Sequence, residues 1–118
     1  MKTFLAIYIG TEAALERSQW KKMDDEERKA REVAGVEAWM EWGSANAASI
    51  IEQGSPLGKA KRVSPEGISD IKNSMTGYAV VQAESHEAAA RLFENHPHFT
   101  IFPGDSVEIM ECLPLPGQ

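Results

Sequence analysis

Cysteine is almost absent from this chain of 118 residues, since Cys112 is the only one in the sequence. A disulfide within the chain is therefore impossible, and a metal cluster built on cysteine thiolates is excluded as well. Small proteins without disulfides are typical of reducing compartments, so we expect a cytoplasmic location.

Long hydrophobic runs are missing too. The most apolar stretch, residues 3–9, ends at Gly10, whereas a helix needs about 20 apolar residues to cross a bilayer. The stretch also lacks the small-x-small cleavage site of a signal peptide. We therefore expect no membrane partner, and we interpret this stretch as a β-strand that stays in the protein.

Basic residues are in the minority. The sequence has 12 lysines and arginines against 18 aspartates and glutamates, which gives a formal net charge of −6. This charge opposes the attraction to phosphates that supplies most of the affinity for nucleic acids. We expect no nucleic-acid partner.

Motifs for common cofactor chemistry are also lacking. The sequence contains no Gly-rich phosphate loop, no dinucleotide-binding fingerprint and no Gly-x-Ser-x-Gly elbow. Any chemistry that the protein performs is therefore expected to need no cofactor.

The residues that are present predict one α+β domain over residues 1–118, because the length and the 42% hydrophobic content suit one globular core. Asp24 and Ser85 are good helix N-caps, and Pro97 is expected to end the second helix. Hydrophobic periodicity and turn residues predict strands at 3–9, 59–64, 76–83 and 106–112, and helices at about 25–48 and 85–95.

The order β-α-β-β-α-β favours a ferredoxin-like sandwich, with four antiparallel strands and both helices on one face. Such a sheet leaves its other face without cover. Large apolar residues occur in the strands predicted at 3–9, 76–83 and 106–112, and they are more than two helices can bury. A second copy of the chain is the natural cover, so we expect a homodimer that packs sheet against sheet, as in a dimeric α+β barrel.

Five segments in this order resemble the YCII-related proteins and the allied DGPF-domain proteins of the dimeric α+β barrel group. The segments are "MKTFLAIYIG", "MDDEERKA", "WMEWGSANAASIIEQGSPLG", "TGYAVVQAESHEAAARLFENHP" and "GDSVEIMECLP". The resemblance covers essentially the whole chain. It implies the dimeric barrel fold, and either a small enzyme that acts on aromatic or lactone compounds or a domain attached to sigma-factor regulation.

The chain also departs from the family pattern. Residues 68–75 read "ISDIKNSM" where DGPF proteins carry their tetrapeptide. The catalytic proposal for YCII proteins rests on a His-Asp pair whose histidine lies near the end of the first strand, and here no histidine precedes His86. That pair cannot be carried over, so catalysis would need other residues.

The two histidines of "ENHPHFTIFPGD", His96 and His98, are two positions apart, a spacing that could suit a metal. A metal site needs a third protein ligand, however, and the sequence offers none nearby, so no metal is expected. His86 is interpreted as a solvated surface residue.

Acid-base chemistry is the other use for this segment. Histidine titrates near neutrality, and a carboxylate on one ring nitrogen raises the basicity of the other. Asp105 follows a Pro-Gly turn and could fold back onto His98. Two interpretations remain open: His98 as a general acid or base oriented by Asp105, or structural roles, with His96 at the end of the second helix and Asp105 at the turn.

Aromatic residues suggest a ligand pocket between helix and sheet, lined by Tyr8, Trp39, Trp42 and His96. The same residues could equally be ordinary core. The sequence therefore predicts a dimeric domain that binds a small apolar or aromatic molecule without catalysis or with divergent chemistry. The alternative is a cofactor-independent enzyme that uses His98 and Asp105.

Overall fold

The computed structural model describes residues 1–117 and contains a four-stranded antiparallel sheet in the order β2-β5-β1-β6. The strands are β1 (Lys2–Ile9), β2 (Ile50–Glu52), β5 (Met75–Ala83) and β6 (Ser106–Glu111). Numbered along the sheet, this is the 2-3-1-4 order of a ferredoxin-like sandwich. The predicted α+β class is confirmed.

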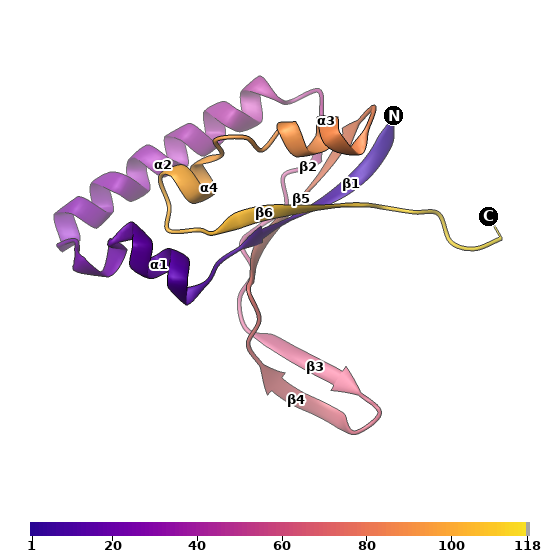
Figure 1. The fold of residues 1–118 in the computed structure, drawn as a ribbon, viewed down its shortest axis with the longest axis horizontal. Coiled ribbons are helices and arrows are strands. Elements are labelled where there is room, and N and C mark those ends of the chain that lie inside the picture. The colour runs from indigo at the N-terminus through magenta and orange to yellow at the C-terminus, as the bar shows by residue number, and fades with distance from the viewer. Residues whose placement is uncertain (118) are drawn as a thin grey trace.

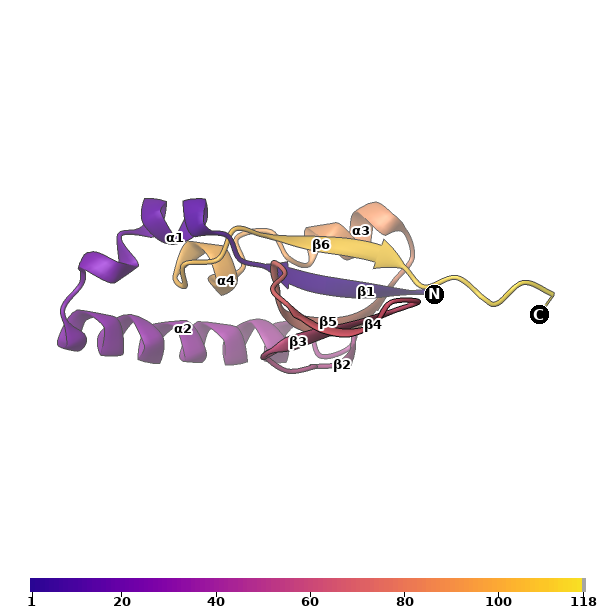
Figure 2. The same cartoon turned by 90° about the horizontal axis from the view of Figure 1, so that it is seen from below.

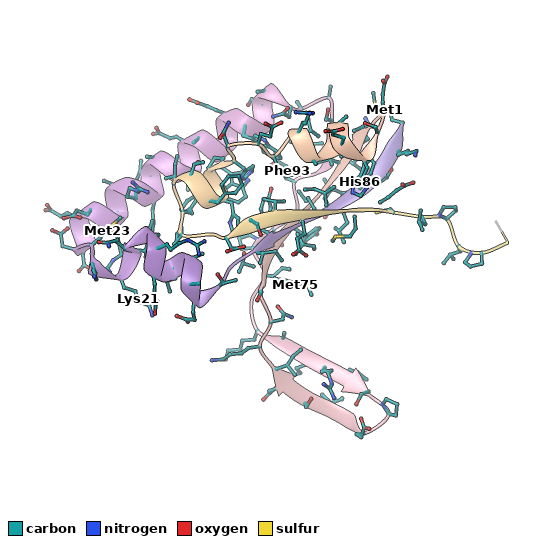
Figure 3. All side chains as sticks on the ribbon, in the orientation of Figure 1. Met1, Lys21, Met23, Met75, His86 and Phe93 are labelled. Atoms are coloured by element: carbon teal, nitrogen blue, oxygen red, sulfur yellow. The ribbon has the colours of Figure 1, made fainter. Side chains whose placement is uncertain are left out.

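The core lies between one face of this sheet and the helices. Side chains alternate along a strand, so Phe4, Ala6 and Tyr8 of β1 point to the same side, where they pack with Ala79 and Val81 of β5. Phe93 packs on this cluster from the helix side, and Figure 3 places it between the helices and the sheet.

Five helical segments connect the strands, and side-chain caps start four of them, including the one-turn helix at Pro97–Thr100. They are α1 (Glu12–Ser18), the 3₁₀ turn η1 (Trp20–Lys22), α2 (Asp25–Ala45), α3 (His86–Arg91) and α4 (Pro97–Thr100). The side chains of Thr11, Asp24 and Ser85 accept bonds from backbone N–H groups of the first turns of α1, α2 and α3. The caps at Asp24 and Ser85 were predicted, whereas α1 and α4 were not. None of the helices in residues 1–117 is long and apolar enough to cross a membrane.

Helix α2 extends beyond the sheet (Figure 2). There α1 and α4 lie beside its N-terminal half, and Arg31 donates from Nη2 to the carbonyl of Ile101 over 3.0 Å. Of its residues, only Gly35 and Gly43 are buried. Most of the surface of this long helix is therefore open.

The strand predicted at residues 59–64 exists, but its placement in the main sheet was wrong. It is β3 (Ala60–Ser64), and it pairs only with β4 (Gly67–Ile71), which the sequence did not reveal. The place beside β5 belongs to the short β2. The β3–β4 hairpin, residues 60–71, projects from the sheet on the side opposite α2, α3 and α4 (Figure 1). We call it the arm; Met75 lies at its base (Figure 3).

The sheet face on the side of the arm carries no helix (Figure 1). By strand alternation, Leu5 and Ile7 of β1 and Val80 of β5 lie on this face. Met110 of β6, which pairs with Leu5, is 42% exposed there. This side of the sheet is therefore an apolar face without a covering helix, on which Leu5 and Val80 are half-buried and Ile7 is 9% exposed.

Candidate functional site

His96 occupies the centre of a cluster of aromatic rings and is fully buried. Its ring lies edge-on to Trp39 with centroids 4.4 Å apart, and to Trp42 at 4.6 Å. Phe93 lies on another side at 5.7 Å. The indole of Trp42 donates from Nε1 to the carbonyl of Leu92 over 2.7 Å, which fixes that wall of the cluster.

His96 also starts the one-turn helix α4, because its Nδ1 accepts a hydrogen bond from the backbone N–H of His98 over 3.0 Å. A neutral imidazole that accepts at Nδ1 carries its proton on Nε2. This Nε2 is buried without a hydrogen-bond partner in residues 1–117. Burial, and secondarily the nearby His98, lowers the pKa of His96 to about 4, so the ring is neutral at pH 7.

His98 is 7% exposed, and its ring bonds to the protein through the other nitrogen, Nε2. Its Nε2 lies 2.8 Å from the carbonyl oxygen of Ile9. A carbonyl can only accept, so Nε2 carries the proton and Nδ1 keeps its lone pair. Gly104 makes room for this ring, since a Cβ there would lie 2.3 Å from two of its atoms.

Burial lowers the pKa of His98 below its ordinary value, while the Ile9 carbonyl, the charge of Asp105 and the backbone of Ser106 act in the opposite direction. The ring is therefore neutral at pH 7, while these neighbouring groups stabilise its protonated form.

Asp105 reaches this site through its backbone and its charge. Its N–H donates to the same Ile9 carbonyl over 2.9 Å. Its carboxylate accepts from Ser106 Oγ at 2.9 Å, from Arg17 Nη2 at 3.3 Å and from Thr11 Oγ1 at 3.4 Å. The Ser106 hydroxyl, followed by Arg17 and Thr11, keeps the pKa of Asp105 below its usual value. The hydrogen bond that orients His98 thus comes from Ile9, and Asp105 acts on it electrostatically.

A pocket of about 450 Å³ opens beside this cluster. Tyr8, Trp39 and His98 line it, as three of the residues singled out from the sequence. The rings of Tyr8 and Trp39 have centroids 4.9 Å apart, and those of Tyr8 and His98 are 5.2 Å apart. Trp42 and His96 are not among the lining residues; they lie behind this wall, packed against Phe93.

The remaining wall was missed in the sequence. It consists of Val36, Met40, Gln53, Gly54, Ser55, Pro56, Thr76, Gly77, Tyr78 and Phe102. One signal could have revealed a part of it, namely the glycine in the middle of α2. A Cβ at Gly35 would lie 2.4 Å from the Phe102 ring, so glycine at this position lets that ring sit against the helix.

Tyr8 contributes an unusual polar group to the site. Its hydroxyl is buried and has no hydrogen-bond partner in residues 1–117, and burial raises the pKa of this phenol. Buried polar groups are nearly always paired, so an unpaired one in a pocket wall calls for an explanation.

Within residues 1–117, no group of three or more His, Cys, Asp or Glu side chains could hold a metal ion.

No protein-family model matches the chain, and no curated protein sequence matches it significantly. Among solved structures, it is similar to 5-chloro-2-hydroxyhydroquinone dehydrochlorinase (TftG) from Burkholderia phenoliruptrix AC1100, whose structure is a complex with 2,5-dihydroxybenzoquinone. The TM-score is 0.52 at 15% sequence identity, with 92% of this chain and 90% of that chain covered. The likeness shows that the two chains share an α+β barrel fold.

Proposed function

We propose that this protein binds a small, flat and mostly apolar molecule, such as an aromatic ring with hydroxyl or carbonyl substituents. The observation that carries the proposal is the pocket of about 450 Å³ with Tyr8, Trp39, Tyr78 and Phe102 in its wall. Its volume lies within the usual range of about 300 to 1,000 Å³ for small-molecule sites, which combine apolar walls with a few polar groups.

The polar groups favour a ligand that carries oxygen atoms. His98 offers a lone pair on Nδ1, and the unpaired hydroxyl of Tyr8 can either donate or accept. A ligand oxygen that reached this hydroxyl would remove the cost of an unpaired buried group, about 1 to 3 kcal/mol. The hydroxyquinone bound by TftG, whose fold this chain shares, belongs to the same chemical class.

We include in the proposal that the protein acts as a homodimer of the YCII-related type. The helix-free sheet face, with Leu5, Val80 and Met110, is the surface for it. A second copy packed on this face would bury these side chains, since apolar patches of this kind mark association surfaces.

The test is a calorimetric titration of the protein with 2,5-dihydroxybenzoquinone and with catechol. We expect dissociation constants of about 1 mM or below for at least one of them, equivalent to at least ~4 kcal/mol. Trp39→Ala should weaken binding about tenfold, while Trp20→Ala, outside the pocket lining, should leave it unchanged. The proposal is wrong if neither compound binds, or if both variants bind equally well.

A second candidate is a cofactor-independent enzyme with His98 as general acid or base, and the fixed tautomer of His98 favours it. Its Nδ1 would take a proton from a ligand hydroxyl or carbon acid, and the resulting imidazolium would keep its Nε2–H bond to Ile9 beside the charge of Asp105. His98→Gln keeps a side-chain donor for Ile9 but removes the base. Turnover of a hydroxyquinone should fall about 10²- to 10⁴-fold in this variant, and an undiminished rate would rule out this role.

A further inference from the structure

We propose that the arm of one chain docks on helix α2 of a second copy and closes the mouth of that copy's pocket. The inference rests on the homodimer proposed above and adds the part of the partner that completes the site. Four features of the described residues support it: an excess of surface, two matching apolar patches, a difference in net charge, and the reach of the arm.

The chain exposes more surface than one folded copy of its size should. Its accessible surface is 8300 Å², whereas a monomeric protein of 13.0 kDa is expected to expose about 6,300 Å². Its radius of gyration is 16.2 Å, against about 13 to 14 Å for a compact domain of this length. The excess of about 2,000 Å² per chain is what a large homodimer interface buries.

One of the two patches lies on α2. Val33, Val36 and Met40 recur at helical spacing and form a stripe, and each is between 52 and 67% exposed. The stripe borders the pocket, because Val36 and Met40 are also part of its lining. Whatever covers this stripe therefore also covers the mouth of the pocket.

The other patch lies on the arm. Val63 of β3 and Ile68 of β4 are directly opposite each other in the hairpin, and they are 77% and 72% exposed. Cross-strand partners share a face, so the two side chains form one apolar surface. An isolated two-stranded hairpin is marginally stable in water, and this one needs a surface to pack on.

The arm and the stripe differ in net charge. On the arm, Lys61 lies on the same face as Val63 and forms an ion pair with Asp70 over 2.6 Å, while Lys59 and Lys72 line the hollow at its base together with this pair. Residues 59–72 contain four basic and two acidic side chains on a chain of net charge −6. On α2, the exposed Glu32 and Glu37 flank the stripe on its two sides. Charges of this kind steer and register an interface.

The arm has both the position and the length that this contact requires. It projects beyond the helix-free face of the sheet (Figure 1), where a second copy is expected. The partner's helix layer begins about one sheet spacing of ~10 Å beyond its own sheet, roughly 20 Å from the base of the arm. From residue 57 to residue 64 the leg of the arm spans about 23 Å at ~3.3 Å per residue. The pocket lies at the β2 edge, since residues 53–56 follow β2 and Tyr78 is in the neighbouring β5. An arm that clasps this edge crosses the pocket mouth.

The experiment uses two full-length proteins, each with one cysteine: Cys112→Ser with Met40→Cys, and Cys112→Ser with Val63→Cys. The proteins are mixed, allowed to exchange subunits and treated with a short bismaleimide. We expect a covalent dimer that joins position 40 of one chain to position 63 of the other, identified by mass spectrometry of the linked peptides. Because each chain has one cysteine, this product can form only between two copies.

The matched control replaces Met40→Cys by Ala34→Cys, on the same helix but turned away from the stripe, and this mixture should give at least tenfold less product. The docking is overturned if the protein is dimeric but the 40–63 product does not exceed that of the control. This holds whether the arm then lies on its own chain or in solvent. Monomeric protein would overturn the docking and the homodimer together.

A second measurement separates the closure of the pocket from its binding function. Val63→Thr with Ile68→Thr keeps β-branched residues in the arm but removes the apolar contact. We expect about tenfold weaker binding of 2,5-dihydroxybenzoquinone, whereas Arg62→Thr on the other face of β3 should bind normally. Unchanged binding in the double variant overturns the closure and leaves the proposed function standing. Failure of the unaltered protein to bind any probe refutes the proposed function instead, and the cross-link still decides the docking.

Discussion

The backbone N–H of His98 donates a hydrogen bond to Nδ1 of His96 over 3.0 Å. This bond fixes His96 in the Nε2–H tautomer, and the bond to Ile9 fixes His98 in the same tautomer, because the protein uses Nδ1 of His96 as an acceptor and Nε2 of His98 as a donor. One imidazole therefore has a structural role within the core, and the other presents a lone pair beside the pocket. The following predictions test this division of roles and the packing that maintains it.

The protein should become less stable as the pH falls, because His96 is neutral and buried in the folded state. Its pKa is about 4 in the folded protein and near 6.5 in the unfolded chain. Between these values the unfolded state binds the extra proton, so the free energy of unfolding decreases as pH falls from 6.5 and the loss is complete near pH 4. The loss amounts to about 3 kcal/mol at ~1.4 kcal/mol per pKa unit. The lowered pKa of His98 adds a loss in the same direction.

Urea denaturation at pH 7 and at pH 4.5 measures this effect. His96→Asn keeps a side-chain acceptor for the N–H of His98 but cannot titrate, so its stability should change less between the two pH values. His86→Gln, at an exposed position, should keep the pH dependence of the unaltered protein. Identical pH dependence in all three proteins would show that His96 is not the group responsible.

Asp105 should act on His98 through its charge. Since its carboxylate bonds to Ser106, Arg17 and Thr11, Asp105→Asn would remove the negative charge that raises the pKa of His98. We expect the pKa of His98 to fall further, as measured by the NMR titration of its ring carbons. Glu66→Gln in the arm removes a charge far from this site and should have no effect. A rise of the pKa in Asp105→Asn would contradict the electrostatic role.

Particular residues show what could be predicted from the sequence. Asp24 and Ser85 mark helix starts through bonds to residues three positions away, short apolar runs identified β1 and β5, and alternation identified β6. Such local rules also identified residues 59–64 as a strand, but they do not show which other strand it pairs with. Ile50–Glu52 is too short to produce a recognisable strand pattern in the sequence, yet it pairs with β5.

The site was only partly visible for the same reason. The acceptor for His98 is a backbone carbonyl 89 positions earlier in the chain, and backbone groups leave no trace in the sequence. Asp105 was singled out because it is a side chain of the right type nearby. Trp39 and Trp42 are equivalent as sequence signals, and only the packing shows that Trp39 lines the pocket while Trp42 bonds to Leu92 behind it.

Trp42 should accordingly matter for stability but not for ligand binding. Trp42→Phe removes the 2.7 Å, part-buried bond to the carbonyl of Leu92, and the loss of a hydrogen bond of this kind costs about 0.5 to 1.5 kcal/mol. The free energy of unfolding from urea denaturation should fall by this amount, while 2,5-dihydroxybenzoquinone binds as before. Weaker binding without a loss of stability would place Trp42 in the pocket wall instead.

Two glycines of α2 provide the last prediction, because the same substitution should have opposite effects at the two positions. Glycine inside a helix normally costs about 0.5 to 1 kcal/mol relative to alanine. At Gly43, a Cβ would lie 2.9 Å from the end of the flexible Gln53 side chain. That side chain can move away, so Gly43→Ala should be neutral or stabilising.

At Gly35, the Cβ would meet the Phe102 ring at 2.4 Å. This ring is rigid and packs near Trp39, with centroids 6.0 Å apart, and Trp20, at 6.2 Å. Overpacking of this kind costs about 1 to 3 kcal/mol, which outweighs the helix gain. Gly35→Ala should therefore lower the melting temperature, and it should weaken binding of 2,5-dihydroxybenzoquinone as Phe102 is pushed toward the pocket. Equal melting temperatures for the two alanine variants would mean that Phe102 does not pack on Gly35 in solution.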